Sequence, residues 1–115
     1  MIFVTNWLRV WSKPNIDDNL IFTALADPTR RRILELLDRA PRPVELLAAE
    51  FAMSRPAVSK HLAALRVAGL VSCTSAGRQN VYALERAALR SVESWLNQFW
   101  SGRLDLLRRI AEGDG

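Results

Sequence analysis

The repeat of apolar residues in the middle of the chain predicts a single amphipathic helix. Val58, Leu62 and Leu65 recur at helical spacing and form one apolar stripe that must pack against another element. Ser54 is a favourable N-cap residue, and Gly69 favours termination after the last apolar position. The segment therefore has a defined beginning, a defined end and one buried face.

The opposite face of this predicted helix carries short polar and cationic groups near its N-terminus. They are Ser54, Arg55, Pro56, Ser59 and Lys60. Neighbouring alanines would allow this face to approach a flat surface closely, and such a helix suits the major groove of DNA. An ordinary amphipathic surface helix fits the same segment equally well, so the flanking segments decide between the two interpretations.

A second, shorter helix is predicted immediately before the first one, over residues 43–51. Val44, Leu47 and Phe51 stand at helical spacing, and only two residues, 52–53, separate this segment from the Ser54 cap. Two helices joined by a tight turn are typical of a helix-turn-helix, in which the second helix reads the DNA.

The segment after the predicted recognition helix indicates a β-hairpin. Residues 70–74 and 80–84 are rich in β-branched and apolar side chains, as strands are. The intervening turn contains Gly77, with Arg78 at its tip and Gln79 beside it. A hairpin in this place is a wing, whose arginine can reach phosphates or the adjacent minor groove.

Two further helices are predicted upstream. A short apolar helix covers residues 19–26, and the next one opens with Asp27 as N-cap and Pro28 at the first helical position. The core positions of that second helix are Ile33, Leu36 and Leu37.

Several of these motifs resemble the ArsR family of bacterial winged-helix repressors in order and spacing. The matching segments read FTALADPTRRRIL (22–34), VSKHL (58–62), AGLV (68–71) and GRQNVY (77–82). The resemblance covers roughly residues 20–84 in detail and the last helix in general pattern. It implies a mainly α fold with a small β-hairpin, a winged helix-turn-helix of four helices, two strands and a long C-terminal dimerisation helix.

The resemblance also implies a sequence-specific transcriptional repressor that binds double-stranded DNA at a pseudo-palindromic operator. By position in the family motif, the DNA-facing residues are Arg55, Pro56, Ser59 and Lys60, with Ser54 able to touch a phosphate. Arg78 and Gln79 complete the expected DNA-binding set from the wing.

The distribution of charge agrees with DNA binding. The net charge is +4, and residues 28–82 carry nine basic against four acidic side chains, while the remainder is nearly balanced. A positive core region is what binding to phosphates requires. An arginine-rich composition, with fourteen Arg to two Lys, accounts for part of the excess.

Catalysis and metal binding are poorly supported. The single histidine, His61, lies in the predicted recognition helix, and the single cysteine, Cys73, lies on a predicted strand without an activating base. The family's metal sites use a Cys-x-Cys before the recognition helix, or Asp, His and Glu on the last helix. Neither pattern is present here. We therefore expect no enzyme activity, no cofactor and no metal, and a thiol switch at Cys73 remains a weak alternative.

The two ends of the chain hold a large amount of aromatic surface. The residues expected to form a dimer contact are Trp7, Trp11, Trp95, Leu96, Phe99, Trp100 and Leu104. Apolar positions from Arg86 to Ala111 form a stripe wider than one small core covers, so we expect a two-fold homodimer.

The sequence predicts a single winged-helix domain over residues 1–115. It comprises an N-terminal extension (1–16), a winged-helix core (17–84) and a C-terminal dimerisation helix (85–112). No apolar run is long enough to span a membrane, and one cysteine fits a bacterial cytoplasmic protein. The alternative function is a protein–protein interaction module on a winged-helix scaffold. The sequence identifies no small-molecule inducer.

Overall fold

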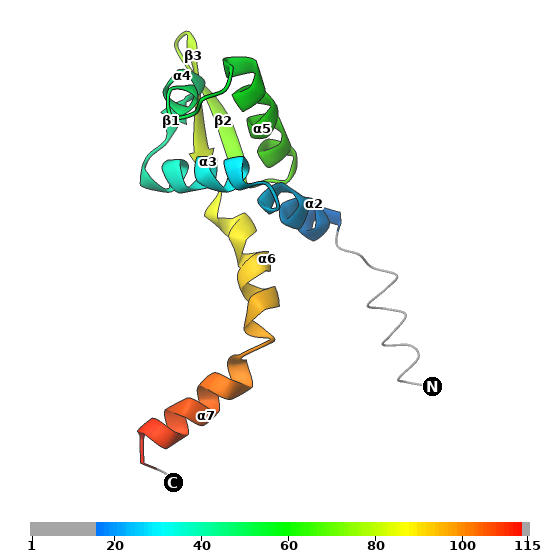
Figure 1. Ribbon diagram of the computed structural model, residues 1–115, viewed down its shortest axis with the longest axis vertical. Coiled ribbons are helices and arrows are strands. Elements are labelled where there is room, and N and C mark those ends of the chain that lie inside the picture. The colour runs from blue at the N-terminus through cyan, green and yellow to red at the C-terminus, as the bar shows by residue number, and fades with distance from the viewer. Residues whose placement is uncertain (1–15, 114–115) are drawn as a thin grey trace, which may run out of the picture.

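The computed structural model describes residues 16–113 and has a mainly helical fold with a small antiparallel sheet (Figure 1). The elements are, in chain order, α2 (Ile16–Leu25), α3 (Pro28–Arg39), β1 (Arg42–Pro43), α4 (Val44–Ala48), α5 (Arg55–Val67), β2 (Val71–Ala76), β3 (Gln79–Leu84), α6 (Arg86–Asn97) and α7 (Ser101–Ala111). The expected winged helix-turn-helix is confirmed, although α2 begins three residues earlier than the sequence pattern indicated.

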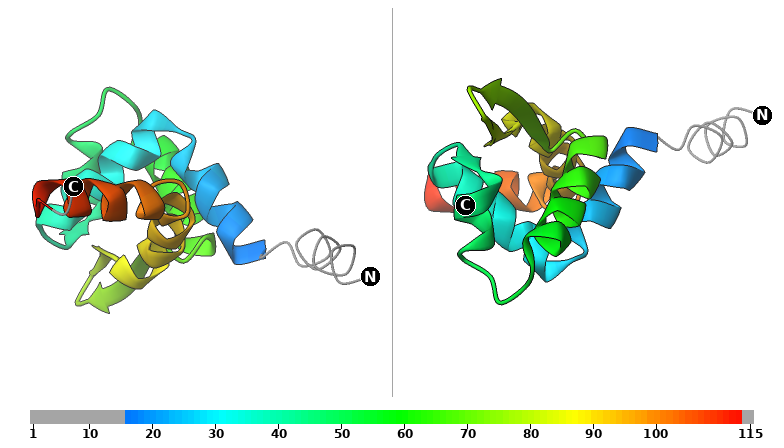
Figure 2. Two further views of the ribbon diagram at one scale, coloured as in Figure 1. Left: turned by 90° about the horizontal axis from the view of Figure 1, so that it is seen from below. Right: turned by 90° about the horizontal axis from the view of Figure 1, so that it is seen from above.

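The core forms where the apolar faces of α3, α4 and α5 meet the sheet. The predicted stripe of α5 is confirmed, because Val58, Leu62 and Leu65 are all fully buried. The fully buried side chains outside α5 are Ile33 and Leu36 of α3, Leu47 of α4, and Leu70 between α5 and β2. Seen from above, α5 lies between α2 and α4 (Figure 2, right), so its buried face is fixed from both sides.

Helix α3 begins as the sequence predicts. The Asp27 carboxylate accepts hydrogen bonds from the backbone N–H groups of Thr29 at 2.7 Å and Arg30 at 3.1 Å, and Pro28 occupies the first turn. These bonds satisfy two of the N–H groups that every helix start leaves without an internal partner.

The sheet contains one strand more than expected. Its order is β1-β3-β2, with both pairs antiparallel and Arg42 opposite Tyr82 in the β1–β3 pair. Strand β1 is only two residues long and ends in Pro43, which cannot donate a backbone hydrogen bond and is therefore tolerated at a sheet edge. Two residues are too few to produce a detectable period of alternation in the sequence.

The predicted helix over residues 43–51 is wrong in its second half. Helix α4 covers Val44–Ala48, and the chain then turns through residues 49–53. The backbone N–H groups of Glu50 and Phe51 donate to carbonyls only three residues back, which tightens the last turn and ends the helix. Phe51 still packs partly buried against the core, as its spacing indicated.

The expected single C-terminal helix over residues 85–112 is also wrong. It is divided into α6 and α7 by a turn at residues 98–100, and the two helices point in different directions (Figure 1). Phe99 and Trp100 donate their backbone N–H groups to carbonyls three residues back, at 3.0 and 3.4 Å, instead of four. The apolar repeat continues across this turn, so periodicity alone did not indicate the break.

Candidate nucleic-acid interface

Helix α5 begins at a capped and exposed N-terminus. The Ser54 backbone is extended, and its hydroxyl oxygen accepts a hydrogen bond from the Ala57 backbone N–H at 3.3 Å. Pro56 occupies the first turn, where its missing N–H removes no helical bond. The positive end of the helix dipole therefore faces solvent, where it favours an anion such as phosphate.

The sequence-predicted DNA-facing residues share one exposed surface of α5. Ser54, Arg55, Pro56, Ser59 and Lys60 are all exposed. The opposite side of the same helix is fully buried, so the helix cannot rotate to hide these groups. This surface, formed by the five residues, is the α5 face.

The hairpin of β2 and β3 brings a second basic group to the same end of the molecule. Gly77 and Arg78 form its two-residue turn, and Gly77 has φ +65°, a conformation that L side chains rarely adopt. Arg78 is exposed at the tip, and Gln79 opens β3 opposite Ala76. Figure 1 shows this tip and the beginning of α5 at one end, with α6 and α7 at the other.

One charged neighbour of the α5 face was missed by the sequence analysis. Nη2 of Arg55 lies 2.7 Å from Oε1 of Glu45, which stands in the first turn of α4. The two side chains remain 61% and 46% exposed. Glu45 and Arg55 are ten residues apart and lie on different helices, so no periodic pattern in the sequence links them. Only the way in which α4 and α5 are oriented in the fold brings the two side chains together.

His61 lies beside a structural arginine. Nη1 of Arg30 is 3.5 Å from the His61 Nδ1, and His61 is half-buried on α5. The pKa of Asp27 is held below its ordinary value of 3.8, chiefly by the hydrogen bond from the Arg30 backbone N–H. Burial opposes this change, while the hydrogen bond from Thr29 and the charges of His61 and Arg30 lower the pKa further. Arg30 thus contacts both α2 and His61 of α5 at the junction of α2, α3 and α5.

Cys73 and Tyr82 lie opposite each other in the middle of the hairpin. Burial raises the pKa of the Tyr82 phenol, and a hydrogen bond with the Cys73 thiol raises it further. Both side chains are only partly exposed. Within residues 16–113, no three His, Cys, Asp or Glu side chains gather closely enough to hold a metal ion.

The C-terminal residues expected at a dimer contact are found largely on the surface. The exposed fractions are 46% for Trp95, 60% for Phe99 and 40% for Trp100, while Leu96 is half-buried. Leu104 is placed only as a position in α7. Trp7 and Trp11 lie outside the described residues.

Aromatic rings tie the exposed surface of α6 to α2. The Trp95 ring packs edge-on against Phe22 of α2 at 5.2 Å between centroids, and against Phe99 at 4.9 Å. Phe22 lies in the segment that the sequence assigns to the monomer core, so its position did not indicate a contact with Trp95.

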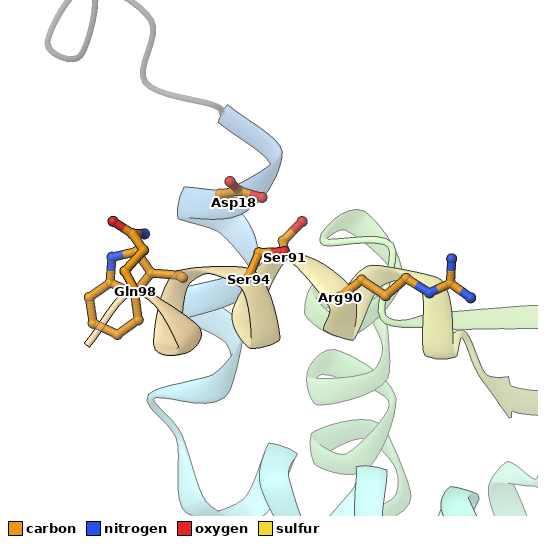
Figure 3. A pocket seen from close by; sticks show the side chains of 6 residues that line it. Asp18, Arg90, Ser91, Ser94 and Gln98 are labelled. Carbon is orange, nitrogen blue, oxygen red and sulfur yellow. The ribbon is translucent and has the colours of Figure 1, made fainter. Parts of the chain in front are cut away.

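A polar hollow of about 370 Å³ adjoins these rings, between α2 and α6 (Figure 3). Asp18 comes from α2, and Ser91, Ser94 and Gln98 line the hollow from the α6 side. Oδ1 of Asp18 is buried and has no hydrogen-bond partner within the described fold.

None of the helices in the described part of the chain has the length and apolar character required to cross a lipid bilayer.

Comparisons with known proteins agree with the geometry. Residues 27–72 match the model of the bacterial regulatory protein arsR family. The chain is 40% identical over 92 residues to the HTH-type transcriptional regulator Rv2034 of Mycobacterium tuberculosis, which is 80% of this chain and 86% of that protein. It is 35% identical to the transcriptional repressor SdpR of Bacillus subtilis, over 70% of this chain and 90% of SdpR.

A solved structure shares the same arrangement. It is the homodimeric winged helix-turn-helix DNA-binding domain of Mb0332 from Mycobacterium bovis, with a TM-score of 0.61 and 27% identity. The match covers 77% of this chain and 82% of the Mb0332 chain. The present chain therefore belongs to the ArsR family of bacterial regulatory proteins and is a DNA-binding transcriptional regulator.

Proposed function

We propose that this chain acts as a homodimeric transcriptional repressor whose α5 face reads the major groove of a pseudo-palindromic operator. The observation that carries the proposal is the division of α5 into a fully buried stripe and an exposed polar face at its N-terminus. Arg55 is the residue we assign to a base edge, because its planar guanidinium can donate two parallel hydrogen bonds to guanine. Ser59 and Lys60 lie on the same face, and Ser54 with the helix N-terminus contacts a phosphate.

The hairpin supports this binding from the side. Arg78 is exposed at the tip, and its charge suits a phosphate or the adjacent minor groove. Gln79 follows it at the start of β3 and supplies a polar group close to the backbone of the DNA. Repression then follows from occupation of the operator, in keeping with the named function of SdpR.

Dimerisation rests on the exposed aromatic surface of α6 and the segment after it. Trp95, Phe99 and Trp100 are 46%, 60% and 40% exposed, and large aromatic side chains are enriched at subunit contacts. The Mb0332 domain, which shares this fold, is homodimeric. We propose that residues 1–115 form one winged-helix domain whose terminal segments make the two-fold contact.

Regulation by a resident metal is not part of the proposal. The described residues offer no cluster of metal ligands, and zinc sites need several nitrogen or sulfur ligands. Adding zinc or a chelator to the purified protein should therefore leave its affinity for DNA unchanged. A change in affinity with either reagent would contradict the metal-independent form of the proposal.

The direct test is selection from a pool of random DNA duplexes by the purified protein, followed by sequencing. We expect an enriched site with two inverted half-sites and binding that weakens steeply with salt, because phosphate contacts release counterions. An interaction module would instead use the exposed apolar surface of α6 and α7. Failure to enrich any sequence, with protein association that persists at high salt, would favour that second function.

A further inference from the structure

We infer that Glu45 determines how selectively Arg55 reads DNA, by holding its guanidinium away from phosphates in the absence of the correct base. The inference rests on the proposed function, in which Arg55 contacts a base edge. The contact between Nη2 of Arg55 and Oε1 of Glu45 is 2.7 Å, and it joins the first turn of α4 to the first turn of α5. It therefore lies at the N-terminal end of α5, where the polar face that we assign to DNA begins.

The ion pair imposes different costs on the two ways in which Arg55 can bind DNA. A guanidinium that binds a phosphate either brings the Glu45 carboxylate close to the negative DNA backbone or leaves that carboxylate there without its partner. A guanidinium that donates to a guanine edge has five N–H groups and needs only two of them. The contact with Glu45 involves Nη2, so the remaining donors can serve the base while the carboxylate stays close.

A purely structural role for Glu45 explains less. Both side chains are about half exposed, and exposed ion pairs contribute little to folding stability. Helices α4 and α5 already pack against each other, and Leu47, Val58 and Leu62 lie fully buried in the same core cluster. Removal of the Glu45 charge should therefore leave the fold intact and change mainly what Arg55 does.

Glu45 places one negative charge on an otherwise basic surface. Lys60 and Arg78 attract DNA of any sequence, because a positive surface binds phosphates without regard to the bases. A carboxylate beside Arg55 reduces this general attraction at the one side chain that we assign to base recognition. Specificity is the difference between the affinity for the operator and the affinity for unrelated DNA. Weaker binding to unrelated DNA therefore increases specificity without tighter binding to the operator.

The test compares Glu45→Gln, Arg55→Ala and the double variant with the wild type. Affinities are measured for the duplex enriched by wild-type selection and for a shuffled duplex of the same length and composition. Glu50→Gln is the matched control, since Glu50 is exposed in the turn after α4 and joins no ion pair within residues 16–113. Thermal unfolding of each variant verifies that the fold is retained.

We expect Glu45→Gln to bind the shuffled duplex about two- to five-fold more tightly, the range typical of an exposed ion pair. Its affinity for the enriched duplex should rise less, so that the ratio of the two affinities falls. The salt dependence on shuffled DNA should steepen by about one unit as Arg55 becomes available to a phosphate. In the Arg55→Ala background the same change should leave the ratio constant, and Glu50→Gln should shift both affinities equally.

The measurements distinguish an error in the role of Glu45 from an error in the assignment of α5 to DNA. If Arg55→Ala lowers the affinity ratio while Glu45→Gln leaves it unchanged, the role of Glu45 is wrong and the proposed function stands. If Glu45→Gln lowers the ratio equally with and without Arg55, the carboxylate acts by general repulsion and the inference is overturned. If Arg55→Ala changes neither affinity, the assignment of α5 fails and the inference fails with it.

Discussion

Arg30, in the first turn of α3, donates a hydrogen bond from Nε to the carbonyl oxygen of Ala24 in the last turn of α2, at 2.7 Å. A second donor of the same guanidinium, Nη2, reaches the carbonyl oxygen of Thr23 at 3.1 Å. The last carbonyls of a helix lack the regular helical partner four residues on, although Thr23 O also accepts from the Ala26 backbone N–H at 3.2 Å. A cation there also meets the negative end of the helix dipole. Arg30 thus attaches α2, and through it α6, to the DNA-binding core.

Replacing Arg30 by Ala should lower the free energy of unfolding by roughly 1–3 kcal/mol, because two carbonyl acceptors lose a charged donor. The Arg30 side chain is only 18% exposed, so water replaces it incompletely. Urea unfolding at one fixed protein concentration measures the change. The control is Arg32→Ala, which removes an exposed pair with Glu35 and should cost less than about 1 kcal/mol. Equal losses in the two variants would contradict the role of Arg30.

The Asp27 cap should make folding stability depend on acidic pH. Its pKa is lowered in the folded protein, chiefly by the Arg30 backbone N–H, so the ionised form is favoured by folding. A lowered pKa contributes stability above the ordinary value of 3.8, and this contribution disappears as the pH falls through the folded value. Asp27→Asn keeps a capping oxygen but carries no charge.

The difference in unfolding free energy between wild type and Asp27→Asn should therefore be present at neutral pH and shrink once the pH drops below 3.8. Chemical unfolding across a pH series measures it. A difference that stays constant over the whole series would mean that the charge of Asp27 contributes nothing.

The parts of the fold that sequence predicted well are those with a repeated or local cause. The buried stripe of α5, the Ser54 and Asp27 caps and the position of Arg78 each depend on residues a few positions apart. The early end of α4 and the turn at residues 98–100 depend on backbone bonds that shift from four to three residues back, which side-chain periodicity does not record. The contact between Glu45 and Arg55 and the packing of Trp95 on Phe22 depend on how helices cross, so only the assembled fold revealed them.

Arg78→Ala should weaken binding to operator and to unrelated DNA by similar factors, since a phosphate contact carries little sequence information. The slope of log affinity against log salt should fall by about one unit. Titrations of both duplexes at several salt concentrations measure this. Arg66→Ala, which removes an exposed arginine from the last turn of α5, is the control and should change the slope less. A loss confined to the operator would mean that the wing reads base edges or groove shape instead.

Replacing Trp95 or Trp100 by Glu should shift the protein from dimer to monomer, because a charge then occupies the exposed aromatic surface. Sedimentation velocity measures the shift. Trp95→Phe is the conservative control and should remain dimeric. Trp95 also packs on Phe22, so Trp100→Glu serves as the second variant if the first one loosens α6. A wild type that sediments as a monomer at micromolar concentration yet binds one operator per chain would refute the dimer.

Loss of the dimer should lower the affinity for the operator, although the residues of the α5 face are unchanged. A monomer offers one half-site's contacts, so operator affinity should collapse in the Trp100→Glu variant while binding to a single half-site stays unchanged. In the proposed dimer, two recognition helices must meet successive major grooves about 34 Å apart. Insertion of about 5 bp between intact half-sites rotates one of them to the opposite face of the duplex, so affinity should fall close to that of a single half-site. Equal affinity for the normal and the expanded operator would show that the two α5 helices bind independently.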